Sequence, residues 1–283
     1  MQYSLTDSIQ PKENTMKVIK PKFARLLKNK AFPRSSKYDP KWVMENDMGP
    51  DALWLTEWLC RAMDLKPDMR LLDMGCGKGL SSVFLAREFG VQVWANDLWI
   101  GASDNWKRIR DAGVEKRVFP IHAEAHALPY AEEFFDAVVS LDSYHYYGTD
   151  DLYLQYFSRF VKPGGQIGIV VPGLMRDLED GKAPKHLTRP QASGKCFWDP
   201  AECFSFHTVD WWRRLWGQTE LVKIETADTQ PDGWRDWLQF EKAKLIAHFG
   251  HGDEVPTLEA DQGRYLGFVR LVARRQQARE VTA

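Results

Sequence analysis

The stretch Leu71–Ser82, LLDMGCGKGLSS, decides how the rest of the sequence is interpreted. It places Asp73 at the end of an apolar run and follows it with glycines at alternate positions, Gly75, Gly77 and Gly79. Because glycine has no side chain, such a backbone can turn sharply and let a ligand lie directly against it. The stretch therefore predicts a strand, a ligand-binding loop and the start of a helix, in that order.

Two common nucleotide-binding loops compete for this motif. A Walker A loop needs GxxxxGK followed by Ser or Thr, whereas Lys78 follows a shorter spacing and precedes Gly79, so this loop is excluded. A dinucleotide loop needs GxGxxG, and Leu80 stands where its third glycine belongs. The GxGxG spacing weakens an NAD site but leaves it open.

Around the loop, short apolar runs rich in β-branched residues alternate with segments of helical periodicity. This alternation predicts a doubly wound α/β domain, a mostly parallel sheet with helices on both faces. The expected strands are 69–75, 91–97, 117–125, 135–143, 165–173, 220–228 and 265–275, and the expected helices are 49–64, 80–90, 102–113, 151–161, 208–218 and 231–249.

The domain organisation follows from this pattern. Residues 1–40 form an expected basic arm, loose and solvated, because the run from 17 to 37 contains no acidic residue. Residues 41–275 form the expected main domain, and 276–283 a C-terminal tail. Within the main domain, 174–206 is rich in Pro, Gly and charge and is too long for an ordinary connection, so we expect a substrate lid there.

Composition limits the class of protein. With 44% hydrophobic and 27% charged residues, the chain of 283 residues reads as a globular protein. A formal net charge of -1 argues against a general nucleic-acid partner. No signal peptide or run of ~20 apolar residues is visible, so we expect a cytoplasmic location without stable membrane association. Cys60, Cys76, Cys196 and Cys203 have unrelated spacings, and we expect neither disulfides nor a metal.

The glycine loop resembles motif I of the class I S-adenosylmethionine-dependent methyltransferases: hydrophobic residues, an acidic residue, then GxGxG. The resemblance covers about 69–173 and includes Asp97 at the end of the second strand, EAHALPY, FDAVVS and VKPGGQIGIVV. It implies a Rossmann-like sheet of seven strands with an N-terminal helical cover and an insert after strand five. The sequence looks most like the small-molecule branch that contains sarcosine, phosphoethanolamine and cyclopropane-fatty-acid enzymes.

The same resemblance implies S-adenosylmethionine as the cofactor. The loop backbone would approach its methionine part, Asp97 would accept its ribose hydroxyls and Leu98 would pack on its adenine. Glu124 and Ala125 take an adenine-edge position that the family usually fills with Asp-Ala, which is a departure. The full expected cofactor set is Asp73, Gly75, Cys76, Gly77, Gly79, Asp97, Leu98, Glu124, Ala125 and Leu141.

Acceptor residues are expected after the fourth strand, in SLDSYHYYG, because parallel sheets bind ligands at the carboxyl ends of their strands. His145 and Tyr144 are the expected catalytic residues, and the near-neutral reference pKa of histidine suits a general base. Aromatic rings can also hold a cationic or planar acceptor. The expected substrate contacts are Tyr146, Trp211, Trp212 and Trp234.

These expectations favour direct in-line methyl transfer to an N, O or S nucleophile of a small molecule. The segment SLDSYHYY does not match the Asn/Asp-Pro-Pro-Tyr signature of amino-methylating nucleic-acid enzymes. Three alternatives stay open: a lipid-modifying or cyclopropane-type enzyme, a non-catalytic S-adenosylmethionine-binding protein, and an NAD-dependent oxidoreductase. A homo-oligomer is compatible with the sequence.

Overall fold

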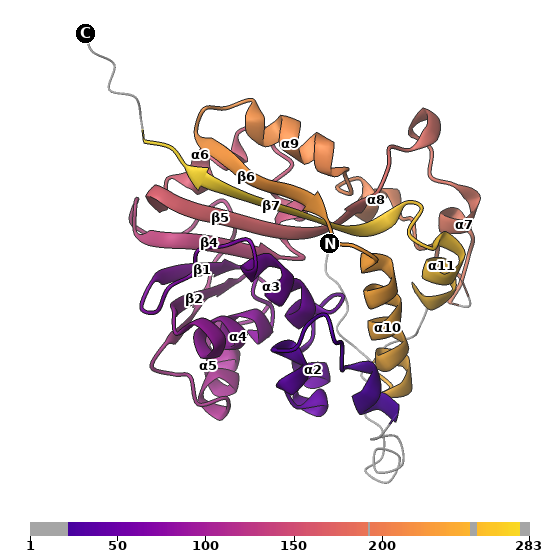
Figure 1. Ribbon diagram of the computed structural model, residues 1–283, viewed down its shortest axis with the longest axis horizontal. Helices are drawn as coiled ribbons and strands as arrows, with labels where there is room; N and C mark the ends of the chain where they lie inside the picture. The colour runs from indigo at the N-terminus through magenta and orange to yellow at the C-terminus, as the bar shows by residue number, and fades with distance from the viewer. Residues whose placement is uncertain (1–21, 192, 250–253, 278–283) are drawn as a thin grey trace.

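The computed structural model describes residues 22–191, 193–249 and 254–277. Its strands form one seven-stranded sheet in the order β3-β2-β1-β4-β5-β7-β6 (Figure 1). Strand β7 runs antiparallel to β5 and β6, and the other neighbouring strands are parallel. This topology confirms the expected fold class. The strands are β1 Arg70–Met74, β2 Gln92–Asp97, β3 Val118–His122, β4 Phe135–Leu141, β5 Val161–Leu174, β6 Val222–Thr229 and β7 Leu266–Arg275.

Helices cover both faces of the sheet. Figure 1 shows α3, α4 and α5 on one side and α6 and α9 on the other. The α-helices are α2 Pro40–Asn46, α3 Ala52–Cys60, α4 Leu80–Phe89, α5 Ala102–Asp111, α6 Tyr153–Ser158, α7 Lys185–Thr188, α8 Pro200–Cys203, α9 Val209–Gly217, α10 Gly233–Ile246 and α11 Glu254–Asp261; the 3-10 helices are η1 Ser35–Lys37, η2 Tyr144–Tyr146 and η3 Glu179–Gly181. No helix in the described ranges is long and apolar enough to cross a bilayer.

Strand β1 explains why its sequence is apolar without alternation. Leu71 joins the core beneath α3 and α4, whereas its neighbour Leu72 joins the core beneath α6 and α9. Both side chains have no exposed surface. A parallel strand that is covered on both faces needs apolar residues along its length, and the charged residues of β1, Arg70 and Asp73, lie at or next to its ends.

The described part of the N-terminal arm is packed, not loose. Phe23, Leu27 and Phe32 are buried in the core. Asn29 Nδ2 donates to Asp236 Oδ1 over 2.7 Å, which ties this segment to α10. The expectation of a solvated arm was therefore wrong for residues 22–37, because its basic residues are interleaved with apolar ones that pack into the core, where Phe32 stacks on Trp54 of α3. Residues 1–21 lie outside the described ranges.

The insert 174–206 packs at one end of the molecule, where α7 contacts α11 (Figure 1). Leu187 of α7 is fully buried, and His186 Nε2 lies 2.7 Å from Asp261 Oδ1 of α11. The insert is thus anchored to the C-terminal helices rather than to the Gly-rich loop.

Candidate active site

A cavity of about 480 Å³ opens where the carboxyl ends of β1, β2 and β4 meet the loop between α2 and α3. This volume falls within the range of roughly 300–1,000 Å³ that is usual for small-molecule sites. None of the described residues of the insert, 174–191 and 193–206, lines it. Of the residues expected from sequence to touch cofactor or acceptor, those that line the cavity are Gly75, Cys76, Gly77, Asp97, Leu98, Glu124, Ala125, Leu141 and Tyr146.

The glycine loop forms the floor of the cavity. Gly75 N and Cys76 N donate to the carbonyl oxygen of Asn96 over 2.9 and 3.0 Å, so the loop is held against the end of β2. Gly75 has φ +74°, and a Cβ at this position would lie 1.9 Å from Ser143 Oγ. The position therefore requires glycine both for its left-handed backbone and for the close approach of β4. Gly79 lies beyond the cavity, as the N-cap of α4.

Asp97 organises the cavity from the end of β2. Its Oδ2 accepts from Gly77 N over 2.8 Å, and its Oδ1 accepts from Trp99 N and Ile100 N over 2.7 and 2.9 Å. A carboxylate offers about four acceptor positions, so roughly one is left for a ligand hydroxyl in this conformation. Asp97 thus joins two loops and still presents an acceptor to the cavity.

Sequence reasoning missed Asn96, although this fully buried side chain also lines the cavity. Its Nδ2 donates to Ala123 O over 3.1 Å, which ties the end of β2 to the loop after β3. A polar residue inside an apolar strand, directly before Asp97, was the available signal.

Glu124 lines the cavity, but its carboxylate accepts from both N and Nδ1 of His126, at 2.7 and 2.8 Å. Burial raises the pKa of Glu124, and the His126 hydrogen bonds outweigh this and lower it.

Asp73 does not line the cavity, in contrast to its expected role in cofactor binding. Its fully buried Oδ2 accepts from Ser81 Oγ and Ser82 Oγ, both over 2.6 Å. Burial raises the pKa of Asp73 to about 6, although the two serine hydrogen bonds act to lower it. Asp73 therefore positions the first turn of α4 behind the glycine loop.

Replacing Asp73 by Asn should change how stability depends on pH. The folded-state pKa lies above the reference value of 3.8, so the wild-type folded state keeps a proton that the unfolded chain has lost. Raising the pH from 4 to 7 therefore destabilises the wild type through this group, by on the order of 2–3 kcal/mol. The free energy of unfolding of Asp73→Asn, measured by urea denaturation, should rise by that amount relative to wild type over this range. Parallel pH profiles would contradict the assignment.

The two expected catalytic residues lie in the protein core. His145 has 1% exposed surface, and its ring packs against Tyr146 and Phe206 with centroids 4.0 and 5.9 Å away. Burial lowers the pKa of His145 to about 3, so the ring is neutral near pH 7. Tyr144 is fully buried among aromatic rings of α6 and α9. Neither side chain lines the cavity, so the structure does not support their expected contact with an acceptor.

The tryptophans expected to contact the substrate also lie outside the cavity lining. Trp212 is fully buried against Tyr144, with ring centroids 5.7 Å apart. Trp211 stacks on His207 with centroids 3.6 Å apart, and Trp234 packs against Gly263, where a Cβ would lie 2.3 Å from its ring. None of the three lines the cavity, because α9 and the start of α10 pack on other parts of the sheet.

Aromatic residues do reach the cavity, but from a different segment. Leu98, Trp99 and Tyr146 line it and expose 50%, 66% and 55% of their surface. The rings of Trp99 and Tyr146 have centroids 6.2 Å apart. Apolar side chains gathered at a cavity mouth indicate a surface that a ligand or partner covers. Sequence reasoning found Leu98 and Tyr146 but missed Trp99.

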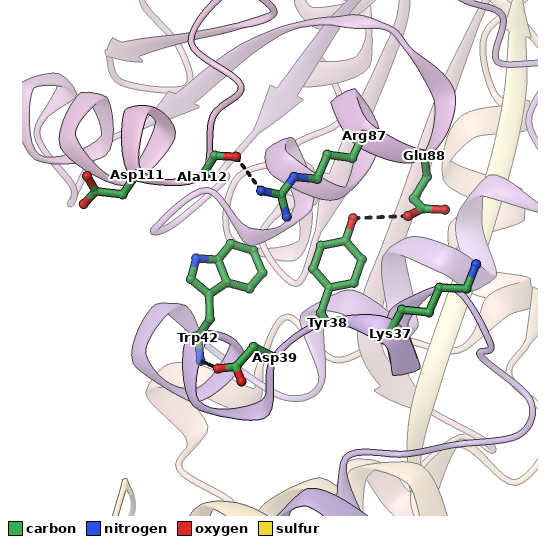
Figure 2. Close-up of a pocket in the computed structure, with 8 residues that line it drawn as sticks. All are labelled: Lys37, Tyr38, Asp39, Trp42, Arg87, Glu88, Asp111 and Ala112. Carbon is green, nitrogen blue, oxygen red and sulfur yellow. Dashed lines mark hydrogen bonds between the residues drawn. The ribbon is translucent and has the colours of Figure 1, made fainter.

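A second hollow, of about 440 Å³, lies between residues 37–42 on one side and the ends of α4 and α5 on the other (Figure 2). Tyr38 and Trp42 stack with centroids 5.6 Å apart, and Tyr38 Oη donates to Glu88 Oε1 over 3.4 Å. Arg87 donates to Ala112 O at the end of α5. These polar groups are paired with one another, and neither a strand end nor the glycine loop lines the hollow. We therefore assign it a structural role, in which the N-terminal segment packs against α4 and α5.

Metal chemistry finds no support in the described ranges, where no group of three or more His, Cys, Asp or Glu side chains is arranged to hold an ion.

Residues 72–169 match the family model described as Methyltransferase domain. Methyltransferase GfsG of Streptomyces halstedii is 32% identical over 132 residues, which are 44% of this chain and 46% of the relative. Sarcosine/dimethylglycine N-methyltransferase of Halorhodospira halochloris is 30% identical over 126 residues, 44% and 45% of the two chains. The chain thus spans about half the length of these curated relatives.

Among solved structures, phosphoethanolamine N-methyltransferase 2 of Haemonchus contortus in complex with S-adenosyl-L-methionine has a TM-score of 0.63 at 18% identity. The match covers 90% of this chain and 60% of the other. At this identity the likeness supports the fold. Together with the family match, it confirms the resemblance to class I methyltransferases that the glycine motif indicated.

Proposed function

We propose that this chain, whose residues 72–169 match the methyltransferase domain family, binds S-adenosylmethionine in the strand-end cavity and transfers its methyl group to a small-molecule acceptor. One observation carries the proposal. A single cavity joins the Gly75–Gly77 floor and Asp97 to an apolar mouth at Tyr146, so a cofactor and an acceptor have room side by side.

The residues present fit this cofactor. Gly75 and Gly77 line the cavity without side chains, so the methionine part can lie against their backbone. Asp97 keeps acceptor capacity for a ribose hydroxyl, and Leu98 and Ala125 give apolar walls for adenine. Glu124 reaches an adenine amino group only by giving up a bond to His126, so we assign it a smaller part.

When bound, S-adenosylmethionine supplies a methyl group activated by its sulfonium, and the chain's residues have to align a nucleophile and exclude water. Leu141 and Ser143, at the end of β4, line the cavity next to the glycine loop. Neutral, buried His145 supports the ring of Tyr146 instead of removing a proton. The acceptor nucleophile is an N, O or S atom, and direct transfer needs no covalent enzyme intermediate.

The acceptor class and cellular setting are part of the same proposal. The mouth formed by Trp99 and Tyr146 favours an acceptor with an apolar or cationic portion over a nucleic acid. Four free cysteines support a reducing, cytoplasmic setting. We assign the catalytic unit to residues 41–275, with the packed segment 22–40 as its cover.

Isothermal titration with S-adenosylmethionine, S-adenosylhomocysteine and NAD tests the cofactor. We expect both sulfur nucleotides to bind with micromolar affinity and NAD not to bind. After that, transfer of a labelled methyl group is measured to a panel of amines, phenols, thiols and fatty acids. Binding of NAD alone would overturn the proposal, and binding without transfer to any acceptor would favour a non-catalytic binding protein.

A further inference from the structure

Tyr147 lies where the ends of β1 and β4 meet the start of the glycine loop. It is the C-cap of η2, and it lines the cavity. Its Oη lies 3.0 Å from Ser140 Oγ, 3.2 Å from Ser143 Oγ and 3.5 Å from the carbonyl oxygen of Met74. A Cβ at Gly75 would lie 3.7 Å from the same Oη. One hydroxyl group therefore contacts two strand ends and borders the first glycine of the loop.

The hydrogen bonds of this hydroxyl group have a defined direction. Burial raises the pKa of Tyr147 well above its usual value, and the hydrogen bonds with Ser140 and Ser143 oppose this change. The hydroxyl group thus keeps its single proton, which it donates to the carbonyl oxygen of Met74. Both serine hydroxyl groups then donate to Tyr147 Oη. Because Ser143 lines the cavity with its proton already donated, it presents an acceptor there.

The first peptide unit of the glycine loop is held from both sides. The carbonyl oxygen of Met74 accepts from Tyr147, and on the same peptide unit Gly75 N donates to Asn96 O over 2.9 Å. Without these bonds the unit could rotate, because Gly75 has φ +74° and glycine tolerates a wide range of φ. A loop with several orientations binds a ligand more weakly than a preorganised one, since binding has to select one of them.

We propose that Tyr147 is a positioning residue for nucleotide binding, whose hydroxyl group orients the Met74–Gly75 peptide unit and the side chain of Ser143. The inference rests on the proposed function, because the methionine part of the cofactor is assigned to the backbone of the glycine loop. Tyr147 acts on the ligand through these neighbours, so its hydroxyl group contributes to affinity without having to contact the nucleotide.

Tyr147→Phe tests this role. The substitution removes the hydroxyl group and keeps the ring, which packs against Tyr144 and Tyr153 with centroids 5.5 and 5.1 Å away, so we expect the variant to fold. Isothermal titration measures its affinity for S-adenosylhomocysteine. Hydrogen exchange of the backbone amides in the glycine loop, measured without ligand, reports how firmly the loop is held.

Tyr156→Phe is the matched control. Tyr156 Oη accepts from Leu128 N over 2.8 Å, and Tyr156 does not line the cavity. The control variant therefore also loses a tyrosine hydroxyl group that takes part in a hydrogen bond. We expect Tyr147→Phe to weaken S-adenosylhomocysteine binding about tenfold and to speed exchange in the glycine loop, whereas Tyr156→Phe changes neither.

Ser140→Ala provides a second test that does not alter the cavity lining. Ser140 is fully buried in β4 and does not line the cavity, so it can influence the ligand through Tyr147 but not by contact. We expect this variant to weaken S-adenosylhomocysteine binding about threefold. The double variant with Tyr147→Phe should lose no more affinity than Tyr147→Phe alone, because the partner of Ser140 is already absent. If Tyr147→Phe fails to fold, Ser140→Ala alone decides the proposal.

Unchanged affinity in Tyr147→Phe would overturn the proposal, and so would losses that add up in the double variant. If the wild type binds no S-adenosylhomocysteine, the cofactor proposal fails instead. The exchange measurement then still decides whether Tyr147 positions the loop, because it needs no ligand: exchange in the glycine loop as slow as in the wild type would remove this role from Tyr147.

Discussion

Asp97→Ala should lower the affinity for S-adenosylmethionine and S-adenosylhomocysteine by about 100-fold or more. A hydrogen bond to a charged group contributes roughly 1.5–3 kcal/mol, and each 1.4 kcal/mol changes affinity tenfold. The substitution removes the acceptor offered to the ribose, and it also frees Gly77 N, Trp99 N and Ile100 N. The glycine loop and the cavity mouth then lose their common anchor.

Two measurements separate these effects. The dissociation constant from isothermal titration reports the loss of ligand binding, and the melting temperature without ligand reports the loss of loop anchoring. Asp104→Ala is the matched control, because Asp104 is an exposed aspartate on the neighbouring α5 that does not line the cavity. An Asp97→Ala protein that binds both nucleotides with wild-type affinity would remove Asp97 from the site.

The sheet was predictable because its signals are local. Leu71 and Leu72 belong to an apolar run that a parallel strand requires, and the glycines after it mark the turn at the carboxyl end. Asp97 was predictable for the same reason, since its place is set by the end of the next strand. Gly75, Gly77 and Asp97 line the cavity in the structure, and the strand that contains Leu71 and Leu72 leads into it.

The acceptor side was less predictable because long-range packing decides it. The sequence indicates that Trp211, Trp212 and Trp234 belong to helices. Nothing in it shows that these helices cover the sheet away from the cavity. In the same way, Met48 and Gly49 reach the cavity only because the loop between α2 and α3 lies over the strand ends. His145 is buried, whereas the next residue, Tyr146, is exposed. Adjacent positions of η2, just after β4, therefore belong to the core and to the cavity.

Gly75→Ala should abolish measurable binding of both nucleotides, a loss of at least about 100-fold. An L-residue in the left-handed region costs roughly 1–2 kcal/mol, and the new Cβ would meet Ser143 Oγ at 1.9 Å and Ser143 Cβ at 2.4 Å. Relief of this contact requires the loop or the end of β4 to move, and both form walls of the cavity.

Gly164→Ala separates the backbone cost from the loss of the site. Gly164 has φ +80°, close to the +74° of Gly75, but a Cβ there meets nothing within 4 Å and the residue does not line the cavity. Both variants should lose about 1–2 kcal/mol of unfolding free energy from the backbone term, measured by urea denaturation. Only Gly75→Ala should lose more than this and also lose nucleotide binding in the titration. Equal stability losses with binding intact in both variants would show that Gly75 serves the turn alone, and the ligand would then have to lie on another wall of the cavity.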